Sequence, residues 1–353
     1  MLDFAALKEQ IPPVSEEARN RSQSHWDGIA KPLHGLGQLE VQVSRIAALT
    51  GNAHVDIDKR LVVVFCADNG VVAEGVTQTD ASVTATMAGT IRNHRSTVCR
   101  MAAVAGADVV PIDMGMLVRV PGVDGCHIAD GTGNIAAGPA MTREQACDAI
   151  SYGMELAGKY KAQGYQILVT CEMGIGNTTT SSAIASVLLN LPVETVTGRG
   201  AGLSDDGMTR KVGAITRAIA VNCPNPGDPL DVLAKLGGFD IAGMVGLYLG
   251  GALYQIPVVI DGLISSIAAL IAARLCHKSV AAMIPSHSSA EPAAQAILKE
   301  LGMEALIYGG LKLGEGTGAV CMLPLLDMAL SVYNSGAAFT DTGIDPYQEL
   351  GGA

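Results

Sequence analysis

Leu61-Val62-Val63-Val64-Phe65-Cys66-Ala67 is a continuous apolar run that ends on the polar turn Asp68-Asn69-Gly70. This pattern is typical of a parallel strand that is buried on both faces. Further apolar runs lie at 107–114, 165–171, 257–262 and 280–285, separated by helical stretches such as 142–163 and 209–222. The alternation predicts an α/β fold, a Rossmann-like parallel sheet with helices on both faces.

The two ends of the chain do not follow this alternation. Residues 1–50 are helical in character, with a break at Pro12-Pro13 and a turn at 31–37, and the last stretch lacks the strand pattern. We expect residues 1–50 and 325–353 to pack together as a small helical domain. Residues 51–324 then form a large Rossmann-like catalytic domain.

Composition excludes several classes of protein. The formal charge is −11 and no basic stripe is visible, so a nucleic-acid partner is not expected. The eight cysteines are scattered without Cys-x-x-Cys spacing, which indicates reduced thiols rather than a disulfide frame or a zinc site. The amphipathic, charged N-terminus is not expected to be a signal peptide, and apolar stretches such as 264–275 are expected to be too short to span a membrane. We therefore expect a cytoplasmic protein with no membrane partner.

The turn that follows the 165–171 run carries glycines and polar side chains. Cys171-Glu172-Met173-Gly174-Ile175-Gly176-Asn177-Thr178-Thr179-Thr180 leads directly into a helix. Such a turn can hold a phosphate at the helix N-terminus, although a threonine that simply caps the helix would give the same pattern. The turn has neither the dinucleotide fingerprint nor the P-loop ending, which disfavours hydride transfer and nucleoside triphosphate hydrolysis.

Two more polar segments have similar features. Thr197-Gly198-Arg199-Gly200-Ala201-Gly202 is glycine-rich, and Lys211 follows it as a phosphate counter-charge or an ordinary solvated helix lysine. Ile284-Pro285-Ser286-His287-Ser288-Ser289-Ala290-Glu291 follows a predicted strand. A serine hydrolase is disfavoured, because Gly-x-Ser-x-Gly is absent and adjacent triad members should not reach one another. We interpret the hydroxyls as phosphate ligands.

Glu315 lies between two glycines in Leu313-Gly314-Glu315-Gly316-Thr317-Gly318. It is either a solvated loop glutamate or a general base whose pKa a partly apolar pocket would raise. Glu172 is a second carboxylate at a strand end, and Asp68, Asp240 and Asp261 add to the surplus. Magnesium could explain such a surplus, but no spacing requires it.

Taken together, these segments resemble the nicotinate-nucleotide:dimethylbenzimidazole phosphoribosyltransferases along almost the whole chain. The strongest matches are 66–71, 131–135, 138–142, 172–179, 237–240, 261–262 and 313–319. The resemblance implies transfer of phosphoribose from nicotinate mononucleotide to an aromatic base, with inversion to an α-linkage, in a dimer that needs neither metal nor cofactor. It implies that Glu315 is the proton acceptor. It assigns substrate binding to Glu172, Gly174, Gly176, Asn177, Thr178, Gly198, Gly200, Lys211, Gly262, Ser286 and Ser289.

The expected acceptor pocket contains Thr79, Met87 and Leu313, and it departs from the family pattern. Met87 replaces a glutamine, which exchanges a hydrogen-bonding amide for an apolar filler. Asn69, His94 and Lys312 are further departures. One hypothesis is that the acceptor is phenol or p-cresol instead of dimethylbenzimidazole. A second is a catalytically quiet partner subunit of a heterodimer. A dinucleotide-dependent oxidoreductase rests on fold class alone.

Overall fold

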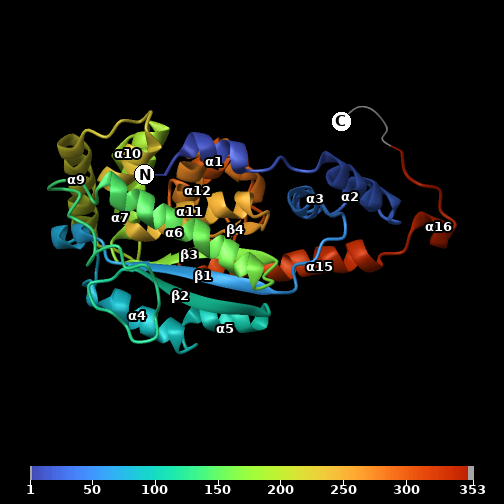
Figure 1. Cartoon of the computed structure of the whole chain (residues 1–353), viewed down its shortest axis with the longest axis horizontal. Helices are drawn as coiled ribbons and strands as arrows, with labels where there is room; N and C mark the ends of the chain where they lie inside the picture. The colour runs from blue at the N-terminus through green and yellow to red at the C-terminus, as the bar shows by residue number, and fades with distance from the viewer. Residues whose placement is uncertain (1, 349–353) are drawn as a thin grey trace.

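A five-stranded parallel sheet forms the centre of the computed structural model, which describes residues 2–348 (Figure 1). The strands are β1 (Arg60–Ala67), β2 (Ala107–Gly115), β3 (Ile167–Met173), β4 (Val258–Ile260) and β5 (Met283–Ile284). Their order is β2-β1-β3-β4-β5, and every neighbouring pair is parallel. The predicted α/β fold is confirmed. The order reverses between β1 and β3, and open sheets bind ligands outside the carboxyl ends of strands near such a point.

Burial on both faces explains the apolar run of β1. Leu61, Val63 and Phe65 belong to one hydrophobic cluster, whereas Val62, Val64 and Cys66 belong to another on the opposite face. The first cluster includes residues of α6 (Arg143–Ala162), α7 (Asn177–Leu189), α9 (Asp205–Asn222), α10 (Pro229–Leu236), α11 (Phe239–Leu253) and α12 (Leu263–Leu275). The second includes residues of α3 (Gln38–Thr50), α4 (Ser82–Arg92), α5 (Thr97–Val104) and α15 (Met322–Ser335).

The remaining helices are short, apart from α2. They are α1 (Phe4–Gln10), α2 (Glu16–Gly28), α8 (Val193–Val196), α13 (Ala294–Glu300), α14 (Thr317–Val320), α16 (Phe339–Thr342), and the 3-10 helices η1 (Gly70–Glu74) and η2 (His277–Ala282). The predicted strands at 257–262 and 280–285 shrink to three and two residues. Gly262 caps α12, and η2 takes up the start of the last run.

The chain contains 42 glycines among its 353 residues, and some of them are required by the contact between α6 and α11. A Cβ at Gly246 would lie 2.0 Å from the carbonyl oxygen of Ile150, and one at Gly153 would lie 2.1 Å from that of Gly243. No real Cβ comes so close to backbone, so the two helices can touch only because these positions lack side chains. These glycines serve packing and not ligand binding.

Helices from both ends of the chain meet on one side of the molecule (Figure 1). The ring of Trp26 on α2 lies 4.8 Å from that of Tyr333 on α15, and Ile29 forms an isolated bridge with Ala338. Leu7 and Ile11, in contrast, belong to the cluster on the other face of the sheet. A small domain of 1–50 with 325–353 stays a prediction, and residues 349–353 lie outside the described residues.

One helical run, Thr317–Ser335, is long and apolar enough to cross a membrane by length and composition alone. Over half of it is buried inside the protein, where α15 packs on α3. The core helix of a globular protein has the same properties.

Candidate active site

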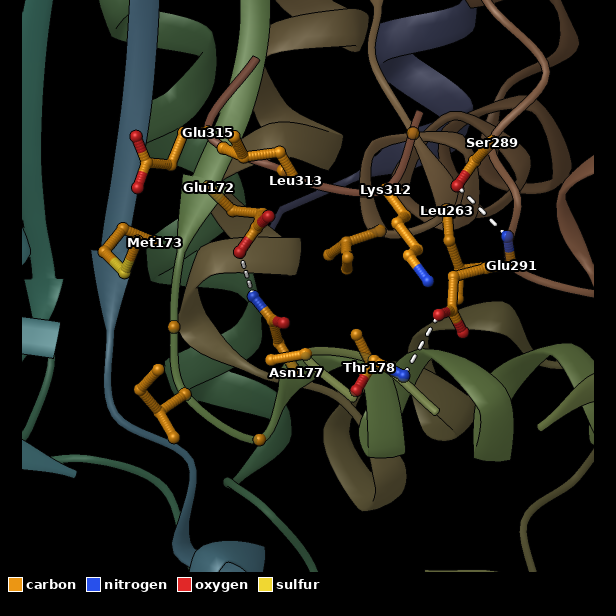
Figure 2. Close-up of a pocket in the computed structure, with 18 of the residues that line it drawn as sticks. Glu172, Met173, Asn177, Thr178, Leu263, Ser289, Glu291, Lys312, Leu313 and Glu315 are labelled. Atoms are coloured by element: carbon orange, nitrogen blue, oxygen red, sulfur yellow. Dashed lines mark hydrogen bonds between the residues drawn. The ribbon is translucent and has the colours of Figure 1, made fainter. Parts of the chain in front are cut away.

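A pocket opens at the carboxyl edge of β3, β4 and β5 (Figure 2). Its walls come from the turns that follow these three strands, from the segment that precedes α14, and from two loops at 76–79 and 199–203. The residues predicted from the sequence that line it are Glu172, Gly174, Gly176, Asn177, Thr178, Gly200, Gly262, Ser289, Thr79, Leu313 and Glu315. The fold thus brings together side chains that are up to 236 positions apart (79 to 315).

Four predicted site residues are not among those that line the pocket: Gly198, Lys211, Ser286 and Met87. The first three lie directly behind lining residues, as their contacts below show. Met87 is half-buried on α4. His94, another departure from the family pattern, follows the end of α4 and lines a different groove beside Tyr165.

Glu315 occupies a strained turn. Its φ is +57°, between +84° at Gly314 and +85° at Gly316, and a left-handed conformation is uncommon for a residue with a side chain. The carboxylate of Asp261, just after β4, fixes this turn by accepting hydrogen bonds from the backbone N–H groups of Gly316 (3.2 Å) and Ala319 (2.9 Å). The position of Glu315 is therefore set by the end of a core strand.

The Glu315 side chain is only 7% exposed, and its Oε2 has no hydrogen-bond partner among residues 2–348. Burial raises the pKa of this carboxyl, and the nearby backbone of Val98 at the start of α5 opposes the shift only in part. In Figure 2 the carboxylate lies on the opposite side of Glu172 from Lys312. Glu315 is thus not a solvated loop glutamate.

Glu172 is the second carboxylate of the pocket and is 8% exposed. The side-chain nitrogen of Asn177 donates to Glu172 Oε2 and, at 3.0 Å, to Asp240 Oδ2 (Figure 2 shows the first of these bonds). Burial and then the charge of Asp240 raise the pKa of Glu172 to about 8, and burial raises that of Asp240 to about 6. The other Glu172 oxygen, Oε1, faces Gly314, where a Cβ would lie 3.1 Å away.

Glycines shape the 172–178 turn. Gly176 has a φ of +96° and caps α7, and a Cβ at Gly174 would lie 2.6 Å from Asp240 Oδ2. The turn therefore aims the N-terminus of α7 at the pocket and leaves room for the buried carboxylate behind it. A helix N-terminus of this kind favours an anion.

Lys211 is fully buried on α9, behind the pocket wall. Its Nζ donates to Thr178 Oγ1 (2.8 Å) and to the carbonyl oxygen of Gly198 (2.9 Å). Burial lowers the pKa of Lys211 to about 8, and the charge of Glu291 opposes this shift. The lysine is not a solvated helix residue, since it ties the 172–178 turn to the 198–202 turn.

Glu291 supports the 198–202 turn from the opposite side. Its Oε1 accepts from the backbone N–H of Gly200 at 3.1 Å, whereas its Oε2 is buried without a partner in the described part of the chain. A Cβ at Gly198 would lie 2.0 Å from this Oε2, so a larger residue there would have to displace the Glu291 carboxylate. In the sequence, Glu291 belongs to the same polar segment as the serines, and nothing in that pattern indicates this role.

Two cationic side chains line the pocket, Arg199 and Lys312. Arg199 pairs with Asp205, whereas Figure 2 shows Lys312 reaching into the pocket with its amine toward Thr178 and Glu291. From the sequence, Lys312 is only a departure from the family pattern and is not a predicted site residue. Its place next to Leu313, a predicted pocket residue, was the available signal.

Ser286, His287 and Asp261 do lie close together, although neighbours in sequence were expected not to reach one another. Ser286 Oγ is 3.2 Å from His287 Nδ1, and Asp261 Oδ1 is 3.9 Å from the same nitrogen. A triad places serine and carboxylate on opposite nitrogens of the ring. Ser286 also donates to the carbonyl of Ile260, so the cluster does not have hydrolase geometry.

Across residues 2–348, no group of three or more His, Cys, Asp or Glu side chains is arranged to hold a metal ion.

The chain is similar to known phosphoribosyltransferases in both sequence and structure. Residues 11–344 match a family described as phosphoribosyltransferase. The nicotinate-nucleotide–dimethylbenzimidazole phosphoribosyltransferase of Ruminiclostridium cellulolyticum is 41% identical over 351 residues, which cover 99% of this chain and 100% of that protein. The protein of the same name from Acetivibrio thermocellus is 40% identical over 347 residues, 98% and 99% of the two chains. The crystal structure of CobT from Thermus thermophilus has a TM-score of 0.88 at 36% identity and covers 94% of this chain and 100% of that one.

Proposed function

Because the chain belongs to the family of nicotinate-nucleotide–dimethylbenzimidazole phosphoribosyltransferases, we propose that it moves the phosphoribosyl group of nicotinate mononucleotide onto an aromatic base and releases nicotinate. The product is an α-ribotide for cobamide biosynthesis. The proposed residue roles rest on one observation: two buried carboxylates and two glycine-rich turns line the same pocket.

The proton on the acceptor is the part of this reaction that needs a catalytic group. The base attacks the anomeric carbon, and the bond from that carbon to the pyridinium nitrogen breaks with its electron pair moving to the ring. The leaving group is cationic beforehand and so departs without a proton. Glu315 is the proposed proton acceptor, because burial makes its carboxylate more basic than one in water.

The donor phosphate is proposed to bind where the 172–178 turn, the 198–202 turn and Ser289 meet. The N-terminus of α7 and free backbone N–H groups suit an anion there, and Lys312 adds a positive charge within the same pocket. Lys211 supports this site from behind by holding Thr178 and Gly198. Ser286 is proposed to act indirectly, because its hydroxyl donates to the carbonyl oxygen of Ile260 at the end of β4 and so holds the segment that leads to Ser289.

The acceptor is proposed to be dimethylbenzimidazole, the base in the names of the relatives. Thr79 and Leu313 line the pocket and can contact it. Met87, on which the phenol hypothesis largely rests, does not line this pocket. Nicotinate release with dimethylbenzimidazole, phenol and p-cresol in parallel decides the matter: turnover with a phenol but not with dimethylbenzimidazole would overturn the proposed acceptor.

The test of the proposed chemistry is Glu315→Gln. The amide keeps the shape of the side chain but cannot accept the proton, so we expect nicotinate release to fall by about 10²–10⁴-fold. The KM for nicotinate mononucleotide should change little, since the donor phosphate is bound by other turns. The measurement is steady-state nicotinate release by chromatography.

Glu194→Gln, an exposed change on α8, is the matched control and should retain full activity. Glu315→Gln must also unfold at the temperature of the wild type or above it for the loss to be chemical. If a folded Glu315→Gln variant turns over normally, Glu315 is not the base.

The quiet-partner hypothesis is not favoured, because the pocket retains Glu315, Glu172 and the glycine-rich turns. The same test addresses it, since the isolated chain should release nicotinate without a paralogous subunit. Dimer formation, with a second copy or with a paralogue, and a cytoplasmic location stay predictions.

A further inference from the structure

Asp240 is a fully buried carboxylate that does not line the pocket. It lies in the first turn of α11, where its Oδ1 accepts from the N–H of Ile241 at 2.9 Å. Its Oδ2 accepts from Asn177 Nδ2, the same nitrogen that donates to Glu172. Two buried carboxylates are thus within hydrogen-bond range of one amide nitrogen, and only Glu172 reaches the pocket.

Negative charges surround this pair. Glu172 faces Asp261 after β4 and Glu315 in the 313–319 turn, and Asp240 faces Asp68 after β1. The thiols of Cys66 and Cys171 complete the shell, with Asp113 behind Cys66. Within residues 2–348, no lysine, arginine or histidine forms an ion pair with Glu172 or Asp240. Two like charges so placed in a low dielectric cannot both be ionised without a large cost.

We propose that Asp240 is a positioning residue that holds a proton on Glu172, so that the pocket works with one ionised carboxylate, Glu315, and one neutral carboxylic acid, Glu172. The inference rests on the proposed function for its catalytic meaning. Asp240 is the partner that ionises first, because it receives a second hydrogen bond from the start of its own helix. The pKa values of about 6 for Asp240 and about 8 for Glu172 agree with this order.

The neutral form of Glu172 has a use in the pocket. Its Oε1 faces Gly314 and the pocket, where an O–H can donate a hydrogen bond to the bound donor nucleotide. The donor carries a phosphate and a nicotinate carboxylate, so an ionised Glu172 would repel it. We therefore expect the wild-type KM for nicotinate mononucleotide to rise as the pH passes about 8.

Asp240→Asn is the decisive variant, because it removes the charge while keeping the shape and an oxygen for Ile241. The ionisation of Glu172 should move down by about one pH unit or more, the usual effect of one neighbouring charge. The rise in the donor KM should move to lower pH by the same amount. Asp148→Asn, an exposed change of the same kind on α6, is the control, since Asp148 is not among the charges that face Glu172 or Asp240. It should leave the profile in place.

A spectroscopic readout keeps the inference testable if Asp240→Asn does not fold. The infrared spectrum of the wild-type protein at pH 7, minus that of Glu172→Gln, should contain the C=O band of a protonated carboxyl group. Absence of this band overturns the inference even if the enzyme is fully active. So does an Asp240→Asn profile that drops uniformly without moving along the pH axis. Absence of nicotinate release, by contrast, would count against the proposed function alone.

Discussion

Burial determines the hydrogen bonds and the pKa of Lys211, and the residues next to it in the sequence do not indicate that burial. Lys211 lies on the amphipathic helix α9, where most lysines are solvated, yet it is fully buried. The cause is the 198–202 turn, which folds over α9 and presents the carbonyl of Gly198 to the amine. The lysine therefore organises two turns of the pocket from behind.

Lys211→Met should raise the KM for nicotinate mononucleotide by about tenfold or more, because losing hydrogen bonds from a charged donor costs about 1.5–3 kcal/mol. The kcat should fall less, since the hydrogen bonds of Lys211 go to Thr178 and Gly198 and not to the proposed base. Lys299→Met, an exposed change in the last turn of α13, is the matched control and should leave both constants unchanged. An unchanged donor KM in Lys211→Met would show that the lysine does not hold the turns.

At the scale of the element, the 313–319 turn shows what sequence can and cannot predict. Its alternating glycines indicated an unusual backbone, and three consecutive residues do have positive φ. The sequence could not show that Asp261, more than 50 positions earlier, fixes the turn through Gly316 and Ala319. Nor could it show that Glu172 and Asp240 share Asn177, because that contact depends on how α11 packs behind β3.

Gly316→Ala should destabilise the protein by about 2–4 kcal/mol and lower activity more than tenfold. An alanine there has a strained φ of +85°, and its Cβ would lie 2.7 Å from the Sγ of buried Cys171. Gly302→Ala separates the two causes, since its φ is +66° and no atom lies within 4 Å of the new Cβ. We expect that control to lose about 1 kcal/mol of folding stability and to keep full activity. Equal urea midpoints for the two variants would contradict the predicted clash.

At the scale of the whole molecule, the sheet could be predicted because burial on both faces leaves a signature in each long strand. The runs at 61–67 and 107–114 match β1 and β2 within a residue at each end. The short strands β4 and β5 were over-extended, because apolar residues in a cap or a 3-10 helix resemble strand residues. Which strand ends meet in the pocket depends on the order of the strands in the sheet, and no local sequence pattern contains that order.

The carboxylates gathered at this edge also set how the stability of the molecule depends on pH. Glu172 and Asp240 titrate with pKa values of about 8 and about 6, and burial raises the pKa values of Asp68 and Glu315 as well. From about pH 4 to pH 8 the folded protein keeps protons that the unfolded chain has lost, so stability falls as the pH rises. The lowered pKa values of Asp80 and Asp228 act only below this window. The pKa of Lys211, about 8, favours the folded state increasingly as the pH rises above it.

We expect the free energy of unfolding, measured by urea titration, to fall by about 2–5 kcal/mol from pH 5 to pH 8. Many proteins, in contrast, are most stable between these two values. Glu172→Gln should match the wild type at pH 5 and exceed it at pH 8, because the amide fits the same place without acquiring a charge. Equal slopes in the two proteins would mean that Glu172 ionises as readily in the folded state as in water. The same carboxylates that give the pocket its proposed base and its neutral acid therefore weaken the fold at the pH where both are needed.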